Sequence, residues 1–199
     1  LKNKRRIWIH AVSVGEMYVA LSLIDRLKNN NNDASFVIST TTPTGYKILL
    51  REKKEGDIAI YFPIDIYFII VKVVKLINPS EVILVEGECW PNLIWQLKKR
   101  GIPILLINGR ISDKSYKNYK KFHFFTKSVY KFLDKSIMQQ RIDAERIIDL
   151  GVKEDRVAVS GNLKYDFFRN LENDKFSDFF GVEKNEDQVI ILASSTWPG

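Results

Sequence analysis

Short runs of Val, Ile and Leu alternate along this chain with longer amphipathic stretches, and this alternation limits the possible folds more than any other feature. Strand-like runs occupy residues 6–11, 35–39, 58–62, 81–85, 104–107 and 136–139, and helix-like stretches occupy residues 16–28, 44–53, 66–77 and 91–99. Strands that are apolar on both faces are typical of parallel sheets covered by helices. The order therefore predicts an α/β protein with a Rossmann-like parallel sheet and helices on both faces.

These elements predict a first domain over residues 1–165. Residues 166–188 mix charged and aromatic side chains with weak periodicity, and we expect them to form a linker between domains. The apolar run that begins at Val189 is interpreted as the first strand of a second domain, of which residues 189–199 would be the truncated start. The absence of an initiator Met and the abrupt end support the expectation that this is a fragment.

The chain has 31 Lys and Arg against 24 Asp and Glu, a net charge of +7. A basic balance favours anionic partners, which include nucleic acid, an acidic membrane surface and phosphorylated substrates. No apolar run reaches the roughly 18 residues that cross a bilayer. The single cysteine, Cys89, excludes an internal disulfide framework, and with only two histidines we expect no metal site.

Polar loops follow each predicted strand, where ligands bind in open α/β sheets. In the loop over residues 10–16, Gly15 permits close approach of a ligand and Ser13 is expected to cap the next helix. Glu16 is either a general base for a sugar hydroxyl or a support for the helix N-terminus. In the loop over residues 40–45, Thr42 and Gly45 either bind an anion or cap a helix.

Two carboxylates, Glu86 and Glu88, follow the fourth strand, and their repulsion requires a cationic or hydrogen-bonding partner for at least one of them. Trp90 could stack on a sugar ring and Asn92 could bind it through its amide. Arg110 is expected to hold a carboxylate or phosphate, or to pair with one of the two acids.

Two further expectations concern single residues. Asp65 should be the N-cap of the helix predicted over residues 66–77. Lys164, which follows Gly161 and Asn162, is a compact positive charge that could face an anionic donor.

Lysines and aromatic residues alternate over residues 114–135. The mixture suits an anionic membrane interface or single-stranded nucleic acid. It also suits two ordinary helices with aromatic core faces and lysines that extend into solvent.

Six motifs together resemble the 3-deoxy-D-manno-octulosonic acid (Kdo) transferase family. They are HAVSVGE at 10–16, TTTPTG at 40–45, YFPID at 61–65, EGECWPN at 86–92, NGRIS at 108–112 and GNLKYD at 161–166. The resemblance runs from about Ile7 to the end of the chain. Two positions depart from the family pattern: Gly87 replaces a Thr or Ser, and Trp197 replaces a His.

The resemblance implies the N-terminal domain of a glycosyltransferase with the B-type fold (GT-B), in which this domain takes a lipid A precursor and the second domain takes CMP-Kdo. The reaction would invert the anomeric centre with no metal ion and no cofactor besides the donor CMP-Kdo. Glu16 matches the proton acceptor, while Glu86 and Lys164 match positions that stabilise the transition state. Candidate substrate-binding residues are Ser13, Gly15, Thr42, Gly45, Glu88, Asn92, Arg110, Ser112 and Asn162.

The resemblance also implies a location on the cytoplasmic face of the bacterial inner membrane, with an anionic membrane surface and no nucleic acid as a partner. The fragment by itself is expected to be inactive. Two alternatives stay open: another nucleotide-sugar enzyme of the same fold, such as an epimerase, and a non-catalytic basic module that binds nucleic acid or membrane.

Overall fold

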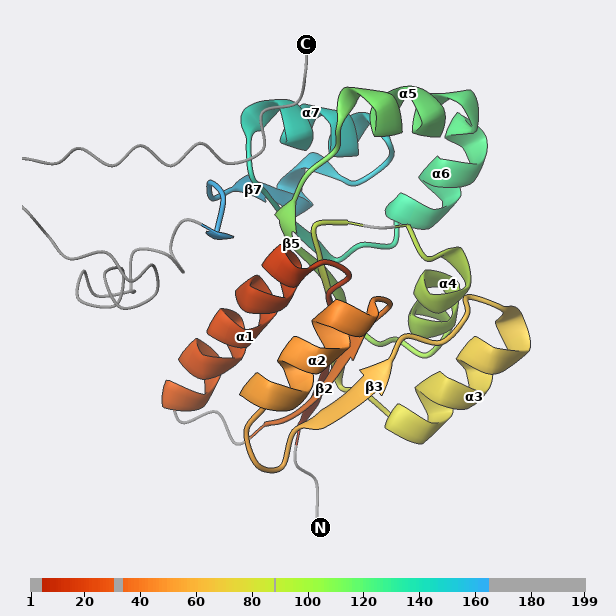
Figure 1. Ribbon diagram of the computed structural model, residues 1–199. Coiled ribbons are helices and arrows are strands. Elements are labelled where there is room, and N and C mark those ends of the chain that lie inside the picture. Colours follow the sequence, from red (N-terminus) through yellow and green to blue (C-terminus); the bar gives the residue numbers. More distant parts are fainter. Residues whose placement is uncertain (1–4, 31–33, 88, 165–199) are drawn as a thin grey trace, which may run out of the picture. The chain divides into compact units, whose positions relative to one another are not determined.

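The computed structural model describes residues 5–30, 34–87 and 89–164 (Figure 1). Its centre is a seven-stranded parallel sheet with the strand order β3-β2-β1-β4-β5-β6-β7. The strands are β1 Arg6–His10, β2 Ser35–Thr40, β3 Ile58–Tyr61, β4 Glu81–Val85, β5 Ile104–Gly109, β6 Lys135–Met138 and β7 Val157–Val159. A parallel sheet of Rossmann type was predicted, and the structure confirms it.

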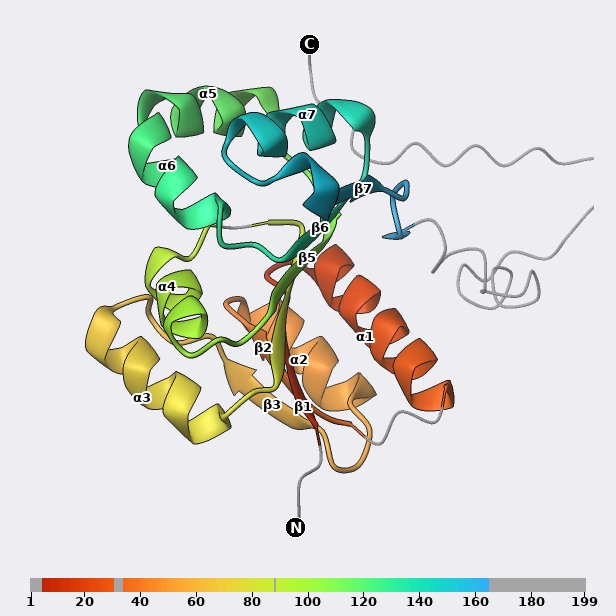
Figure 2. The same cartoon turned by 180° about the vertical axis from the view of Figure 1, so that it is seen from behind.

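Helices cover both faces of this sheet, as Figures 1 and 2 show from opposite sides. They are α1 Val14–Asn29, α2 Pro43–Glu52, α3 Tyr67–Ile77, α4 Pro91–Lys99, α5 Asp113–Lys121, α6 His123–Tyr130 and α7 Arg141–Asp149, with a 3-10 turn at Glu154–Arg156. Helices α1 and α2 pack on one face, and α3, α4, α6 and α7 pack on the other. The helix α7 was not among the predicted elements.

In the central strands β1, β2, β4 and β5, alternate residues enter opposite cores, which explains why these strands are largely apolar. In β1, Ile7 and Ile9 face α1 and α2, while Trp8 faces the α3 and α4 side. The Trp8 indole donates a hydrogen bond to the Ser39 hydroxyl at 2.8 Å, so its buried N–H is satisfied. Because both faces of the strand are buried, a one-residue slip of register would exchange the two cores.

The strand order reverses between β1 and β4, because β2 and β3 extend the sheet on one side and β5 to β7 on the other. The loops that leave the carboxyl ends of β1 and β4 therefore diverge. In open α/β sheets this switch point is where ligands bind. The loops after β1 and β4 carry Glu16 and Glu86, so the fold brings these two predicted residues to the same edge.

Asp65 caps a different helix from the one predicted. The N-cap residue of α3 is Ile66, which makes no capping side-chain hydrogen bond. The Asp65 carboxylate instead accepts hydrogen bonds from the backbone N–H groups of Asn92, at 3.0 Å, and Leu93, at 2.9 Å. The prediction was wrong because Ile66, and not Asp65, occupies the N-cap position of α3, and the Asp65 carboxylate instead meets the free N–H groups at the start of α4.

The predicted linker over residues 166–188 and the predicted strand within residues 189–199 lie outside the described residues. The domain division therefore stays a prediction.

Candidate functional site

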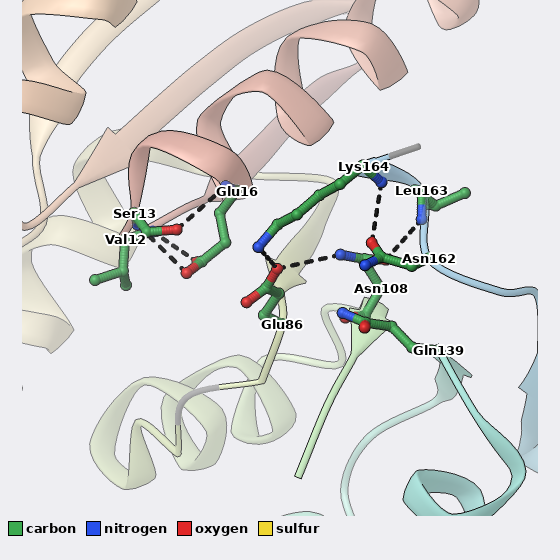
Figure 3. Close-up of polar contacts among 9 residues, drawn as sticks. All are labelled: Val12, Ser13, Glu16, Glu86, Asn108, Gln139, Asn162, Leu163 and Lys164. Carbon is green, nitrogen blue, oxygen red and sulfur yellow. Dashed lines mark hydrogen bonds and ion pairs between the residues drawn. The ribbon is translucent and has the colours of Figure 1, made fainter. Parts of the chain in front are cut away.

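The loop after β1 is fixed by a reciprocal cap at the start of α1 (Figure 3). The Ser13 hydroxyl accepts from the Glu16 N–H at 3.2 Å. The Glu16 carboxylate accepts from the N–H groups of Val12, at 2.8 Å, and Ser13, at 3.3 Å. Glu16 is 7% exposed. Its expected supporting role at the helix N-terminus is confirmed, and its role as a base stays a prediction.

The threonine-rich loop after β2 closes onto the same segment. The hydroxyls of Thr40 and Thr42 both donate to the Val12 carbonyl, at 3.2 and 2.9 Å. Thr42 also accepts from the Gly45 N–H at 3.2 Å, so its predicted capping role at α2 is confirmed. A Cβ on Gly45 would lie within 2.8 Å of both hydroxyls, so Gly45 leaves room for these hydroxyls.

Glu86 directly follows β4 and adopts a left-handed backbone conformation, with φ of 63°. Its carboxylate forms an ion pair with the Lys164 ammonium and accepts a hydrogen bond from the Asn108 amide at 3.2 Å (Figure 3). A cationic partner for one of the two acids was predicted, and for Glu86 that partner is Lys164.

Arg110 does not pair with Glu86 through its side chain. Its backbone N–H donates to the Glu86 carbonyl at 3.2 Å, while the guanidinium is exposed and makes no ion pair with any described residue. The cation beside the Glu86 carboxylate is therefore Lys164 and not Arg110. Its predicted binding of a carboxylate or phosphate is untested.

Gly15 lies inside the first turn of α1 rather than in a sharp turn. A Cβ at this position would lie 3.0 Å from Lys164 Cε and 3.2 Å from its Nζ. The close approach that the sequence predicted at Gly15 is therefore made by the protein's own Lys164 side chain. Glycine at this position keeps open the path from Lys164 to Glu86.

Two residues proposed for sugar contacts take part in packing. The Asn92 amide donates to the Asp65 carbonyl at 2.7 Å. The Trp90 ring lies 4.5 Å from Phe62 and 5.6 Å from His10, centroid to centroid. Their contact with a sugar stays a prediction.

Of the other predicted substrate-binding residues, Ser112 and Asn162 make contacts within the described part of the chain. Ser112 caps α5 through the Ser115 N–H at 3.2 Å. The Asn162 side chain accepts from the Lys164 N–H at 3.0 Å, which holds the backbone of Lys164 (Figure 3). Glu88 lies outside the described residues.

Asn108 and Gln139 were overlooked in the sequence. The Asn108 side chain contacts both Glu86 and the Leu163 N–H, and the Gln139 amide donates to the Asn108 carbonyl at 3.0 Å. Both residues are buried. The Asn108–Gly109 pair at the end of an apolar strand could have pointed to Asn108. Asn tolerates a left-handed backbone, which Asn108 adopts here with φ of 51°.

Two groups beside the site, the buried His10 and the partly buried Cys89, are held in their neutral forms. Burial lowers the pKa of His10 to about 4, against a smaller opposing effect of its hydrogen bond to the Ser39 carbonyl. Burial, and secondarily the charge of Asp65, raises the pKa of the Cys89 thiol to about 12. A thiol with so high a pKa is a poor nucleophile at neutral pH.

A basic aromatic surface covers α5 and α6. We define it by the exposed residues Lys114, Lys117, Lys121, Phe122, Phe124 and Phe125. Phe124 is 93% exposed, whereas Tyr119 packs on the core and Tyr130 is buried in it. The segment thus forms two helices with an aromatic core face, as one interpretation expected, and also presents aromatic rings to solvent. A hollow of about 440 Å³ adjoins it, lined by Cys89, Pro91, Asn118, Tyr119, Phe122, Phe125 and Thr126.

Over the described ranges, no three His, Cys, Asp or Glu side chains gather in a way that could hold a metal ion. Within the same ranges, no helix combines the length and apolar character needed to span a membrane.

Comparison with known proteins connects these features to one family. The model of the 3-deoxy-D-manno-octulosonic-acid transferase family matches residues 1–167. The chain is 32% identical over 193 residues to a 3-deoxy-D-manno-octulosonic acid transferase of Haemophilus influenzae, covering 97% of this chain and 45% of the relative. It is 36% identical over 210 residues to a bifunctional glycosyltransferase/methyltransferase of Fusobacterium nucleatum, covering 100% of this chain and 31% of the relative. The chain thus spans less than half the length of these relatives.

Solved structures of the same fold share little sequence with this chain. A UDP-GlcNAc 2-epimerase from Neisseria meningitidis bound to UDP-GlcNAc has a TM-score of 0.63 at 13% identity, over 88% of this chain and 51% of that one. A glycosyltransferase from Rickettsia africae has a TM-score of 0.52 at 17% identity, over 92% of this chain and 51% of that one. These likenesses confirm the predicted fold class, the Rossmann-like half of GT-B glycosyltransferases and epimerases.

Proposed function

This chain belongs to the 3-deoxy-D-manno-octulosonic acid transferase family, and we propose that it is the acceptor-binding domain of an enzyme that transfers Kdo from CMP-Kdo to a lipid A precursor. The main observation in support of the proposal is that Glu16, Glu86 and Lys164 lie near one another at the switch point of the sheet (Figure 3). The proposal includes a second, donor-binding domain.

Glu16 is the proposed general base. It takes the proton of the acceptor sugar hydroxyl while that oxygen bonds to the anomeric carbon of Kdo, and CMP leaves with the electrons of the broken bond. Each Glu16 carboxylate oxygen accepts one backbone hydrogen bond, from Val12 or from Ser13, and keeps a second lone-pair site. The two bonds hold the carboxylate in one orientation. The proposed reaction inverts the anomeric centre and uses no metal ion.

Lys164 is the proposed electrostatic stabiliser. CMP departs as an anion and Kdo carries a carboxylate, so a fixed cation lowers the barrier. Glu86 pairs with this ammonium, and the Lys164 and Glu86 side chains are 31% and 20% exposed. This contact supports a role for Glu86 in holding the ammonium in place.

The basic aromatic surface is the proposed contact with lipid. Exposed Phe rings beside Lys117 and Lys121 suit the interface of an anionic bilayer, where each lysine near the surface contributes about 1 kcal/mol. We place the protein on the cytoplasmic face of the bacterial inner membrane on this basis and on that of the family. The proposal excludes nucleic acid as the natural partner.

The test is a transfer assay with the two-domain enzyme. CMP-Kdo and a lipid A precursor are incubated with it, and mass spectrometry follows the lipid for the mass of added Kdo. UDP-GlcNAc is assayed in parallel for epimerisation, because epimerases share this fold. Kdo addition without epimerisation supports the proposal, and epimerisation without Kdo addition would replace it.

A further inference from the structure

We propose that Asn108 is a positioning residue that sets the Lys164 ammonium against Glu86, and that Gln139 fixes Asn108 in turn. The inference rests on the proposed function for its catalytic consequence. Its structural basis is independent of the reaction.

The Asn108 side chain uses both ends of its amide. Its Nδ2 donates to Glu86 Oε1 at 3.2 Å, and its Oδ1 accepts from the Leu163 N–H at 2.9 Å (Figure 3). The first bond holds the carboxylate where the Lys164 side chain ends. The second bond holds the residue next to Lys164, where that side chain begins. One amide therefore fixes both ends of the Lys164 side chain.

The backbone of Asn108 is arranged for this purpose. Asn108 adopts φ of 51°, and the pairing of β5 with β6 shifts register between Leu106 and Gly109. A register shift of this kind redirects a side chain at the end of a strand. Left-handed backbone at a non-glycine residue costs free energy unless surrounding contacts maintain it. The Gln139 amide, which donates to the Asn108 carbonyl at 3.0 Å, is such a contact.

Burial makes the amide specific for these partners. Asn108 is 0% exposed, so water cannot substitute for a lost bond. A buried polar side chain without partners is destabilising, whereas here both the donor and the acceptor of the amide are engaged. An apolar residue would leave the Leu163 N–H without its acceptor and Glu86 without its neutral donor.

The variant Asn108→Asp removes the hydrogen bond to Glu86 and keeps the one from the Leu163 N–H, so it tests the two bonds separately. Asp also tolerates the left-handed backbone, and its carboxylate still accepts from the Leu163 N–H, but once ionised it cannot donate to Glu86. In the two-domain enzyme we expect turnover to fall by about 10-fold or more near pH 8, which is the scale of loss when a hydrogen-bond partner of a functional side chain is removed. The KM for the lipid should change less than about 2-fold. The deficit should shrink towards about pH 5.5, because a protonated Asp can donate again.

Asn78→Asp is the matched control. Asn78 is also left-handed, with φ of 46°, but it is exposed at the end of α3. We expect this variant to keep parental turnover at both pH values. Asn108→Gly, which suits the same backbone and removes both bonds, should lose turnover without recovery at low pH and should expose the Leu163 amide to hydrogen exchange.

Two results would overturn the inference. One is parental turnover in Asn108→Asp at both pH values. The other is an equal deficit at every pH together with lost protection of the Leu163 amide, which would indicate a purely structural residue. If the parent enzyme transfers no Kdo, the proposed function fails. The inference about Asn108 is then tested by the NMR signal of the Lys164 ammonium. A shift of that signal in Asn108→Asp but not in Asn78→Asp supports it, and no shift refutes it.

Discussion

The Lys164 side chain crosses the first turn of α1 to reach the Glu86 carboxylate, and it can do so because residue 15 has no side chain. The crossing joins the segment after β7 to the end of β4. The ion pair is partly shielded from water, with Lys164 31% and Glu86 20% exposed, so its geometry matters more than that of a surface pair.

Gly15→Ala should therefore reduce activity without reducing stability. The added Cβ would lie 3.0 Å from Lys164 Cε, and the flexible end of that side chain must move away from it. We expect roughly 10-fold slower Kdo transfer, since a displaced cation stabilises the transition state less. The free energy of unfolding should stay the same or rise by up to about 1 kcal/mol, because Ala favours a helix over Gly. Turnover and urea denaturation measure the two effects.

A Lys164→Ala background provides the control for this prediction. If Gly15 acts through Lys164, adding Gly15→Ala to Lys164→Ala should cause little further loss, since coupled residues are non-additive. A full further 10-fold loss in the double variant would show that Gly15 acts on something else, such as the acceptor.

Glu16→Gln should lower turnover by at least about 100-fold, the usual scale for losing a general base. Gln keeps one acceptor oxygen, which can retain the shorter bond from the Val12 N–H, and it gives up the 3.3 Å bond from the Ser13 N–H, so we expect only a small effect on the loop and on lipid binding. Glu81→Gln is the matched control, because Glu81 is a carboxylate at the opposite end of β4 that pairs with Arg5 at 2.7 Å. Near-parental turnover in Glu16→Gln would remove Glu16 from the mechanism.

Replacing Lys114, Lys117 and Lys121 by Gln should weaken binding to anionic vesicles by roughly 100-fold at low salt, at about 1 kcal/mol for each lysine. Lys120 is left in place because it pairs with Asp149 at 2.9 Å. The control replaces three other exposed lysines, Lys47, Lys135 and Lys153, and so removes the same charge elsewhere. Equal weakening in both triple variants would assign the effect to net charge rather than to the basic aromatic surface.

Stability should fall as the pH drops from about 7 to about 5 because of His10. Burial lowers its pKa to about 4, while the unfolded chain binds a proton near 6.5. The unfolded state therefore holds more protons between these values, and this contribution is complete above about pH 6.5 and lost as the pH falls towards 4. The expected loss from pH 7 to pH 5 is about 2 kcal/mol.

Urea denaturation of the parent and of His10→Gln at both pH values isolates this contribution. Since Gln does not titrate, the variant should lose about 2 kcal/mol less than the parent over the same interval. The same pH dependence in both proteins would show that other groups control it.

The sequence predicted most of the strands and the loops that follow them, because apolar runs and turn residues are local signals. It did not predict the contacts among the candidate site residues. The partner of Glu86 was not predicted, since Lys164 and Arg110 are both cations and the local sequence does not decide between them. Asp65 shows the same limit: its carboxylate caps a helix whose first residue lies 26 positions further along the chain, at Pro91.

The backbone of Val12 is held by three side chains from two parts of the chain, with Glu16 on its N–H and Thr40 and Thr42 on its carbonyl. A loop fixed in this way has little conformational entropy left to lose when a ligand arrives. Substrate binding is then not weakened by the need to order this loop. It also follows that α1 and the end of β2 must evolve together here, since Glu16, Thr40 and Thr42 all hold the backbone of the same residue.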